Sequence, residues 1–192
     1  MRFALFACAG LLLAGIGPAR AQDLSDEQAA ELQCVHNALV ARRATSLVAQ
    51  SYLSETTANG FRGRADAALE AAATGCARLY EWDDVVRGLG VAIGTMGSTA
   101  DFLGAQLTAA GVAEATVEKI AALKPGLSKR DTELLLDGGW SDDRAFMARM
   151  KTKLLAAGVP DDEAVILNAV KMLEAEVIGA DFIASFVEAQ FS

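Results

Sequence analysis

The stretch Gly88–Gly111, GLGVAIGTMGSTADFLGAQLTAAG, holds the strongest pattern in this chain. Its glycines recur every seven residues, at Gly90, Gly97, Gly104 and Gly111. Because seven residues is close to two turns of an α-helix, a helix here places these glycines in one row along its surface. Each interior glycine lowers helix stability by about 1 kcal/mol relative to alanine. A chain that keeps such residues on one face is expected to bring another backbone close to that face.

The rest of the sequence is typical of a helical protein. Alanine is the most frequent residue, aromatic residues make up 6% of the chain, and prolines are few. No stretch shows the sustained alternation of β-branched and polar residues that is typical of strands. We therefore predict an all-α fold, a single-domain bundle of about six or seven helices.

The first residues have the pattern of a signal peptide. Arg2 is followed by the apolar run 3–16, and Pro18 and the small-x-small triplet Ala19–Ala21 follow that run. Cleavage after this triplet is typical of such a leader, and the run is too short for a membrane-spanning helix. Lipoprotein processing at Cys8 is disfavoured, because it would leave part of the apolar run on the exported protein.

Removal of residues 1–21 as a signal peptide leaves one helical domain, 22–192, and predicts a periplasmic or secreted protein. The leader contains Arg2 and Arg20, so its removal changes the formal net charge from −8 to −10. A surface this acidic disfavours nucleic acid and anionic membranes as partners. An unknown protein or a small apolar ligand is left as the expected partner.

Two long helices are expected before the glycine-rich one. Ser25–Gln28 fits a capping box that begins the first helix, and Asn59–Gly60 is expected to end it. The second helix is predicted from Arg64 to Tyr80, and a break at Trp82–Asp84 separates it from the next. The residues expected to face the core are Leu32, Val35, Leu39, Leu47, Val48, Tyr52, Leu69, Ala72, Cys76 and Leu79.

Shorter helices and a final long one are expected in the second half of the chain, over residues 114–123, 128–136, 141–157 and 161–190. Ser128 and Ser141 are the expected N-caps of the middle two. The segment 124–130 is interpreted as a basic turn on the surface, since it lacks the spacing of a phosphate-binding loop.

Leu107–Val112 and Leu154–Val159 share one pattern for ending a helix. In each, a glycine follows the helix and a valine comes next, as in a Schellman motif. Gly111 and Gly158 are therefore expected to adopt the left-handed conformation. We interpret the similarity as the same helix ending used twice rather than as an internal repeat.

Cys34 and Cys76 are the cysteines that remain after the leader, and an even number in an exported protein favours a disulfide. The bond would join the first two predicted helices. Closing a loop of this length stabilises the fold by about 4 kcal/mol in the chain-entropy model. A redox-active pair is disfavoured because the two residues lack the C-x-x-C spacing.

His36 is the single histidine of the chain. It lies two residues from Cys34, so the two side chains point to different faces of a helix and cannot share a metal. The sequence contains no zinc, calcium, phosphate-loop or nucleophile-elbow motif, so we predict no metal, no cofactor and no catalytic residue. We expect His36 to be solvated or half-buried.

A tryptophan followed by paired acids occurs twice, in Trp82–Asp84 and in Trp140–Asp143. Acids at a helix N-terminus beside a packed indole explain both clusters. A pair of carboxylates that acts on a substrate such as a glycan is the alternative.

The glycine row itself is the main candidate site. The predicted groove is formed by Gly90, Gly94, Gly97, Gly104 and Gly111. We expect it to pack against another helix inside the monomer. Its small-residue spacing also occurs in helix pairs within membranes, but Asp101 in the middle of the stretch disfavours a membrane span.

Three functions are compatible with these features. The leading hypothesis is an exported, non-enzymatic interaction protein, such as a binding, chaperone-like or inhibitor module. The second is a carrier that holds a small molecule or lipid along the Gly90–Gly97–Gly104 groove. The third is an enzyme that uses the tryptophan–acid clusters.

Overall fold

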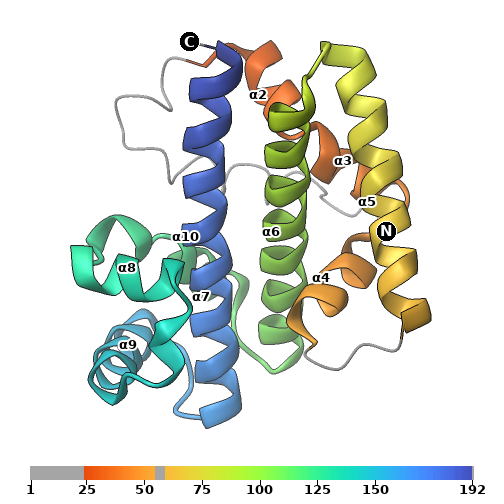
Figure 1. Cartoon of the computed structure of the whole chain (residues 1–192). Helices are drawn as coiled ribbons and strands as arrows, with labels where there is room; N and C mark the ends of the chain where they lie inside the picture. The colour runs from red at the N-terminus through yellow and green to blue at the C-terminus, as the bar shows by residue number, and fades with distance from the viewer. Residues whose placement is uncertain (1–23, 55–58, 192) are drawn as a thin grey trace.

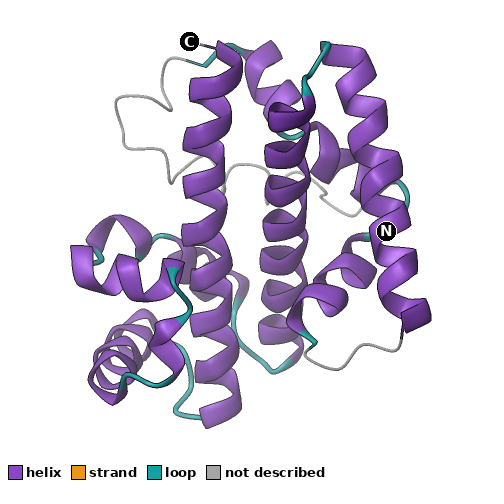
Figure 2. Cartoon of the chain, viewed as in Figure 1, coloured by secondary structure: helices purple, strands orange, loops and turns teal. Residues whose placement is uncertain are grey.

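The computed structural model describes residues 24–54 and 59–191, so the predicted signal peptide lies outside the described residues. The described residues form nine α-helices, two short 3-10 helices and no strand (Figure 2). The α-helices are α2 (Asp26–Leu32), α3 (Cys34–Ala41), α4 (Thr45–Leu53), α5 (Asn59–Tyr80), α6 (Asp84–Ala109), α7 (Glu114–Ala121), α8 (Lys129–Leu136), α9 (Arg144–Ala157) and α10 (Glu163–Phe191). The all-α prediction is confirmed, whereas the number of helices is larger than expected.

α6 and α10 are the central pair of the fold (Figure 1). With 26 and 29 residues they are the longest of the described helices, and they pack along each other. α3, α4 and α5 pack on α6, while α7, α8 and α9 pack on α10, so each central helix supports one flank of the molecule. The glycine-rich stretch therefore lies at the centre of the protein.

Two apolar cores hold the flanks to the central pair. The first core lies where α2–α5 meet the beginning of α6 and the end of α10. Its largest fully buried side chains are Leu32, Leu39, Ile93 and Phe186. The second core lies where α7–α9 meet the end of α6 and the beginning of α10. Its largest fully buried side chains are Leu103, Leu107, Ile120, Leu135, Phe146, Met150, Leu154 and Leu173.

The disulfide between Cys34 of α3 and Cys76 of α5 is present as predicted. The two Cα atoms lie 5.9 Å apart, which is a usual separation for a disulfide. The bond joins two helices that both pack on α6.

The first predicted helix is wrong, because the chain forms three helices in its place. The helix breaks at Gln33 and again at Arg42–Ala44, where Arg43 has a φ of 55°. The break at Arg42–Ala44 rotates the segment that follows it, so that Leu39 and Val48 both reach the first core. A single straight helix would carry these two side chains on opposite faces, because they are nine residues apart and each residue turns the helix by about 100°.

Three further residues of this region lie differently from the prediction. Asn59 begins α5 instead of ending the preceding helix, because α4 ends at Leu53 with Ser54 as its cap. Tyr52 and Leu79 were expected in the core, but they are 46% and 68% exposed. They lie on the outer sides of α4 and α5, because α4 turns Val48 and Ala49 toward the core and α5 turns a face rich in alanine toward it.

The predicted capping residues begin α2, α6 and α8, and α9 is the exception. Its N-cap is Asp143 rather than Ser141, and Asp143 Oδ1 accepts a hydrogen bond from Phe146 N at 2.9 Å. Gly139–Ser141 form a 3-10 helix that buries Trp140, so α9 begins later than the sequence pattern indicates.

Gly111 and Gly158 end α6 and α9 in the predicted manner. Their φ angles are 90° and 102°, in the left-handed region. In each motif the valine N–H donates a hydrogen bond of 3.0 Å to the carbonyl of the leucine five residues earlier, which is the long bond of a Schellman motif. The leucine and the valine of both motifs are buried in the second core.

Candidate functional site

The glycine row of α6 has two halves with different surroundings. In the first half, a Cβ atom added at Gly90 would lie 2.7 Å from Trp82 Cζ3, and one added at Gly94 would lie 2.6 Å from Val35 Cγ1. Side-chain atoms do not approach each other so closely, and packed interiors have no free space to relieve the overlap. The first half of the row is therefore filled by α3 and by the Trp82 indole.

In the second half, Gly97 and Gly104 line a pocket of about 410 Å³ between α6, α7 and α10. The lining residues are Gly97, Ala100, Asp101, Gly104, Ala105, Thr108, Glu114, Val117, Met172 and Glu176. A Cβ atom at Gly104 would lie 3.4 Å from Val117 Cγ1, which is an ordinary contact. Gly111 lies beyond the end of α6, so the last glycine of the predicted groove is not part of the helical row.

Glu176 of α10 is the most buried charged residue of this pocket lining. It is 2% exposed, and its Oε2 atom has no hydrogen-bond partner among the described residues. Lys124 Nζ lies 3.8 Å from Oε2, beyond hydrogen-bond distance, and donates instead to the backbone carbonyl of Glu176 at 3.5 Å. Burial raises the pKa of Glu176, an effect that Lys124 opposes and Asp101 reinforces.

Lys124 lies inside the molecule, so the prediction of a basic surface turn is wrong at this residue. Its side chain is 10% exposed. Lys124–Gly126 form the 3-10 helix η1, which packs on α10 and brings Lys124 to Glu176. Burial lowers the pKa of Lys124, and the carboxylate of Glu176 counteracts that effect.

His36 of α3 contributes a second polar pair beside the pocket. Its Nε2 lies 3.1 Å from Oδ2 of Asp101, which lines the pocket from α6. The Nδ1 atom of His36 has no hydrogen-bond partner within the part of the chain that the structure describes. The His36 side chain is 10% exposed, so the expectation of a solvated or half-buried histidine is wrong. The reason is the close packing of α3 on α6: Val35 lies against Gly94, and this contact carries the next residue onto α6.

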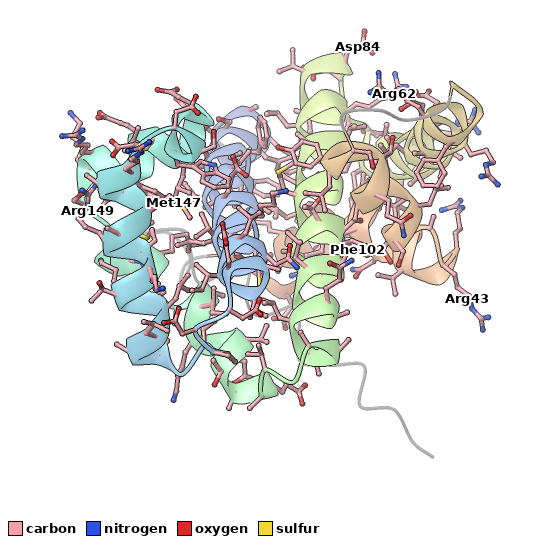
Figure 3. The ribbon with its side chains drawn as sticks, turned by 90° about the horizontal axis from the view of Figure 1, so that it is seen from below. Arg43, Arg62, Asp84, Phe102, Met147 and Arg149 are labelled. Atoms are coloured by element: carbon pink, nitrogen blue, oxygen red, sulfur yellow. A yellow bond between two sulfur atoms is a disulfide. The ribbon has the colours of Figure 1, made fainter. Side chains whose placement is uncertain are left out.

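The charged residues of the pocket lining are all acidic. Asp101, Glu114 and Glu176 contribute three carboxylates, and no Lys, Arg or His is among the described residues that line the pocket. Figure 3 shows Arg43 and Arg149 on opposite outer flanks of the molecule, away from the space between α6 and α10. Apart from these carboxylates and Thr108, the lining is apolar or glycine.

The two tryptophan–acid clusters both serve the fold. In each cluster one aspartate is the N-cap of the helix that follows. Each indole donates a hydrogen bond to a distant glutamate: Trp82 Nε1 to Glu31 Oε1 at 2.6 Å, and Trp140 Nε1 to Glu174 Oε1 at 2.7 Å. Both rings are buried. These contacts match the packing interpretation of the clusters, with capping acids beside buried indoles.

Sequence reasoning did not predict Glu176 or Lys124 as site residues. Glu176 falls within the apolar stripe of α10, beside Leu173 and Val177, and an acid inside such a stripe was the available signal. Lys124 gave no signal, because its partner lies 52 residues away and the contact depends on how η1 packs.

The described residues contain no group of three or more His, Cys, Asp and Glu side chains suited to a metal ion. Among the helices described, none is long and apolar enough to cross a membrane. The fold and the pocket thus define a class: an all-α, disulfide-linked protein whose central helices border a mainly apolar pocket with acidic groups. No protein-family model, no curated protein and no solved structure matches this chain. The inference of function therefore rests on the pocket and its neighbours.

Proposed function

We propose that this chain is an exported, non-enzymatic carrier that holds a small molecule in the pocket between α6, α7 and α10. The observation that carries the proposal is the pocket itself. Its volume of about 410 Å³ falls within the range of roughly 300–1,000 Å³ that is common for ligand pockets. The pocket is also lined by Gly97 and Gly104, two members of the glycine row that forms the strongest pattern in the sequence.

The composition of the pocket lining suits a ligand with an apolar body. Gly97 and Gly104 remove side chains from the α6 wall, which leaves room for a ligand close to the helix backbone. Val117 and Met172 supply apolar surface, and methionine adapts to ligands of irregular shape. A few polar groups among apolar walls are the usual means by which such pockets orient a ligand.

The interaction-module hypothesis is the second candidate, and one observation favours it. Leu79 near the end of α5 and Val85 near the start of α6 are 68% and 65% exposed. They lie on either side of the connection between these helices and offer apolar surface to a protein partner. The enzyme hypothesis gains no such support, because the capping role of the acids already accounts for the tryptophan–acid clusters.

Native mass spectrometry of protein purified from a periplasmic extract tests the proposal. We expect a small molecule to remain bound to the wild-type chain. Gly104→Leu should fill the pocket and abolish binding while the melting temperature changes little, since its Cβ makes only an ordinary contact. Gly88→Leu is the matched control, because Gly88 has open space around it on the same helix and should keep the ligand.

Two results would contradict the carrier proposal. A bound protein in place of a small molecule would favour the interaction module. A small molecule that stays bound equally well to Gly104→Leu would place its site elsewhere in the chain.

A further inference from the structure

We infer that the ligand of this pocket is an organic cation, an apolar body with a protonated amine that the pocket carboxylates hold. The inference rests on the proposed carrier function and adds the chemical class of the ligand. Its basis is the acidic charge of the pocket lining, together with the burial of Glu176 and the missing hydrogen bond at its Oε2.

Charge complementarity is the first argument. Asp101, Glu114 and Glu176 line one pocket, and none of the described lining residues is basic. The nearby basic side chains lie behind the acids: His36 contacts Asp101 from α3, and Lys124 contacts Glu176 from η1. The three carboxylates of the lining outnumber these two basic side chains, within a chain whose formal net charge is −8. An excess of acidic groups favours cations over anions as ligands.

The unsatisfied oxygen of Glu176 is the second argument. Glu176 is 98% shielded from solvent, and its Oε2 has no hydrogen-bond donor in the structure. Leaving one oxygen of a buried carboxylate without a hydrogen-bond donor is unfavourable. Lys124 forms an ion pair with this oxygen, but its Nζ lies 3.8 Å away, beyond hydrogen-bond distance, and it donates to the backbone carbonyl at 3.5 Å. A ligand ammonium group brings both the missing donor and the opposite charge.

A bare metal ion fits these residues poorly. The described residues offer no group of three His, Cys, Asp and Glu side chains close enough to share an ion. The apolar walls around Gly97, Gly104 and Met172 would contribute no ligand to a metal. An amine with an apolar body makes use of both parts of the pocket.

Isothermal titration calorimetry with three probes tests the inference: octylamine, 1-octanol and octanoate, which share one apolar chain and differ in charge. The protein is the mature chain with its disulfide intact, at neutral pH, where an alkylamine is protonated. We expect octylamine to bind at least about tenfold more tightly than 1-octanol, and octanoate to bind most weakly of the three.

Two variants test whether the pocket carboxylates cause the preference for octylamine. Glu176→Gln keeps the shape of the side chain and should lower the affinity for octylamine toward that for 1-octanol, with the 1-octanol affinity unchanged. Glu114→Gln changes an exposed residue at the pocket, so it should fold normally and weaken octylamine binding alone. Glu118→Gln, an exposed change on α7 outside the pocket lining, is the control and should bind all three probes as the wild type does.

The outcomes separate this inference from the carrier proposal. Octanoate or 1-octanol bound as tightly as octylamine would overturn the cation inference and leave the carrier proposal intact. Octylamine binding that neither Glu176→Gln nor Glu114→Gln weakens would also overturn it. No binding of any probe, together with no small molecule on the purified protein, would overturn both.

Discussion

At the scale of single residues, the pair formed by Asp131 of α8 and Arg149 of α9 shows how charge joins neighbouring helices. Asp131 is 3% exposed, and Arg149 donates to its Oδ1 from Nη2 at 2.5 Å and from Nε at 3.2 Å. Burial opposes ionisation of Asp131, but hydrogen bonds from Arg149 and Ser128 and the charge of Arg149 outweigh it, so the pKa of Asp131 lies below its ordinary value. The ionised form is therefore the one that stabilises the fold.

We predict that Asp131→Asn lowers the melting temperature by several degrees at neutral pH. Because the native pKa of Asp131 is depressed, its contribution is fully present above the unfolded-state pKa of about 3.9 and is lost as the pH falls through the lower native value. The difference between wild type and variant should therefore be constant near neutrality and shrink below about pH 4. Thermal unfolding at a series of pH values measures this, with the exposed Asp181→Asn as the control. A difference that stays constant into strong acid would contradict the assignment.

At the scale of elements, the helix endings of α6 and α9 can be tested at their left-handed glycines, Gly111 and Gly158, where alanine should destabilise the fold to different extents. Gly158→Ala and Gly111→Ala should each destabilise by about 1–2 kcal/mol, because a side chain strains the left-handed conformation. Gly158→Ala should be the worse, since its Cβ would also lie 3.3 Å from Thr116 Oγ1 while Gly111 has open space. Urea unfolding measures both, and a neutral result at both positions would mean that the endings relax without strain.

The first half of the glycine row on α6 gives the complementary test. Gly90→Ala and Gly94→Ala should each lower the free energy of unfolding by about 1–3 kcal/mol, the usual range for overpacking. Their added Cβ atoms meet a buried indole ring and a valine side chain at 2.7 and 2.6 Å. Gly88→Ala, on the open side of the same helix, should instead stabilise by up to about 1 kcal/mol through helix propensity. Equal changes in the free energy of unfolding for all three variants would show that close packing does not explain the row of glycines on α6.

The elements that the sequence predicted correctly are those whose ends depend on local chemistry. A serine cap, an acid before a helix, or a glycine followed by valine acts within one helical turn, so Ser128 and Gly158 could be recognised without any tertiary contact. Asn59 was placed at the wrong end of a helix, and the turn at Arg43 was not predicted, because neighbouring helices decide where those segments turn. The pocket was likewise predictable only in part. The seven-residue spacing of its glycines can be read from the sequence, whereas the contact of Lys124 with α10 depends on packing between distant segments.

At the scale of the whole molecule, export remains a prediction that is simple to check. The pattern of residues 1–21 predicts that the mature chain begins at Gln22. N-terminal sequencing or intact-mass measurement of the exported protein should find that residue, free or cyclised. A mature form that keeps the apolar run, or one acylated at Cys8, would contradict both the export route and the charge of −10 expected after cleavage.

Two apolar cores share the helix pair α6 and α10. Removal of the disulfide therefore tests whether the two flanks of the molecule unfold independently. The bond joins α3 to α5, both of which belong to the first core, and closes a loop with a sequence separation of 42. By the chain-entropy model, opening that loop destabilises the structure by about 4 kcal/mol. The second core contains no residue of α3 or α5. Local opening should therefore appear first in the flank that loses its cross-link.

We predict that reduction, or the paired change of Cys34 and Cys76 to serine, accelerates hydrogen exchange of the α3 and α5 amides at a temperature well below the melting transition. The amides of α7–α9 should keep most of their protection under the same conditions, because their core is intact and rests on the far ends of α6 and α10. Hydrogen exchange followed by mass spectrometry resolves the two flanks. Equal loss of protection in both would mean that α6 and α10 couple the cores so tightly that the chain opens only as one unit.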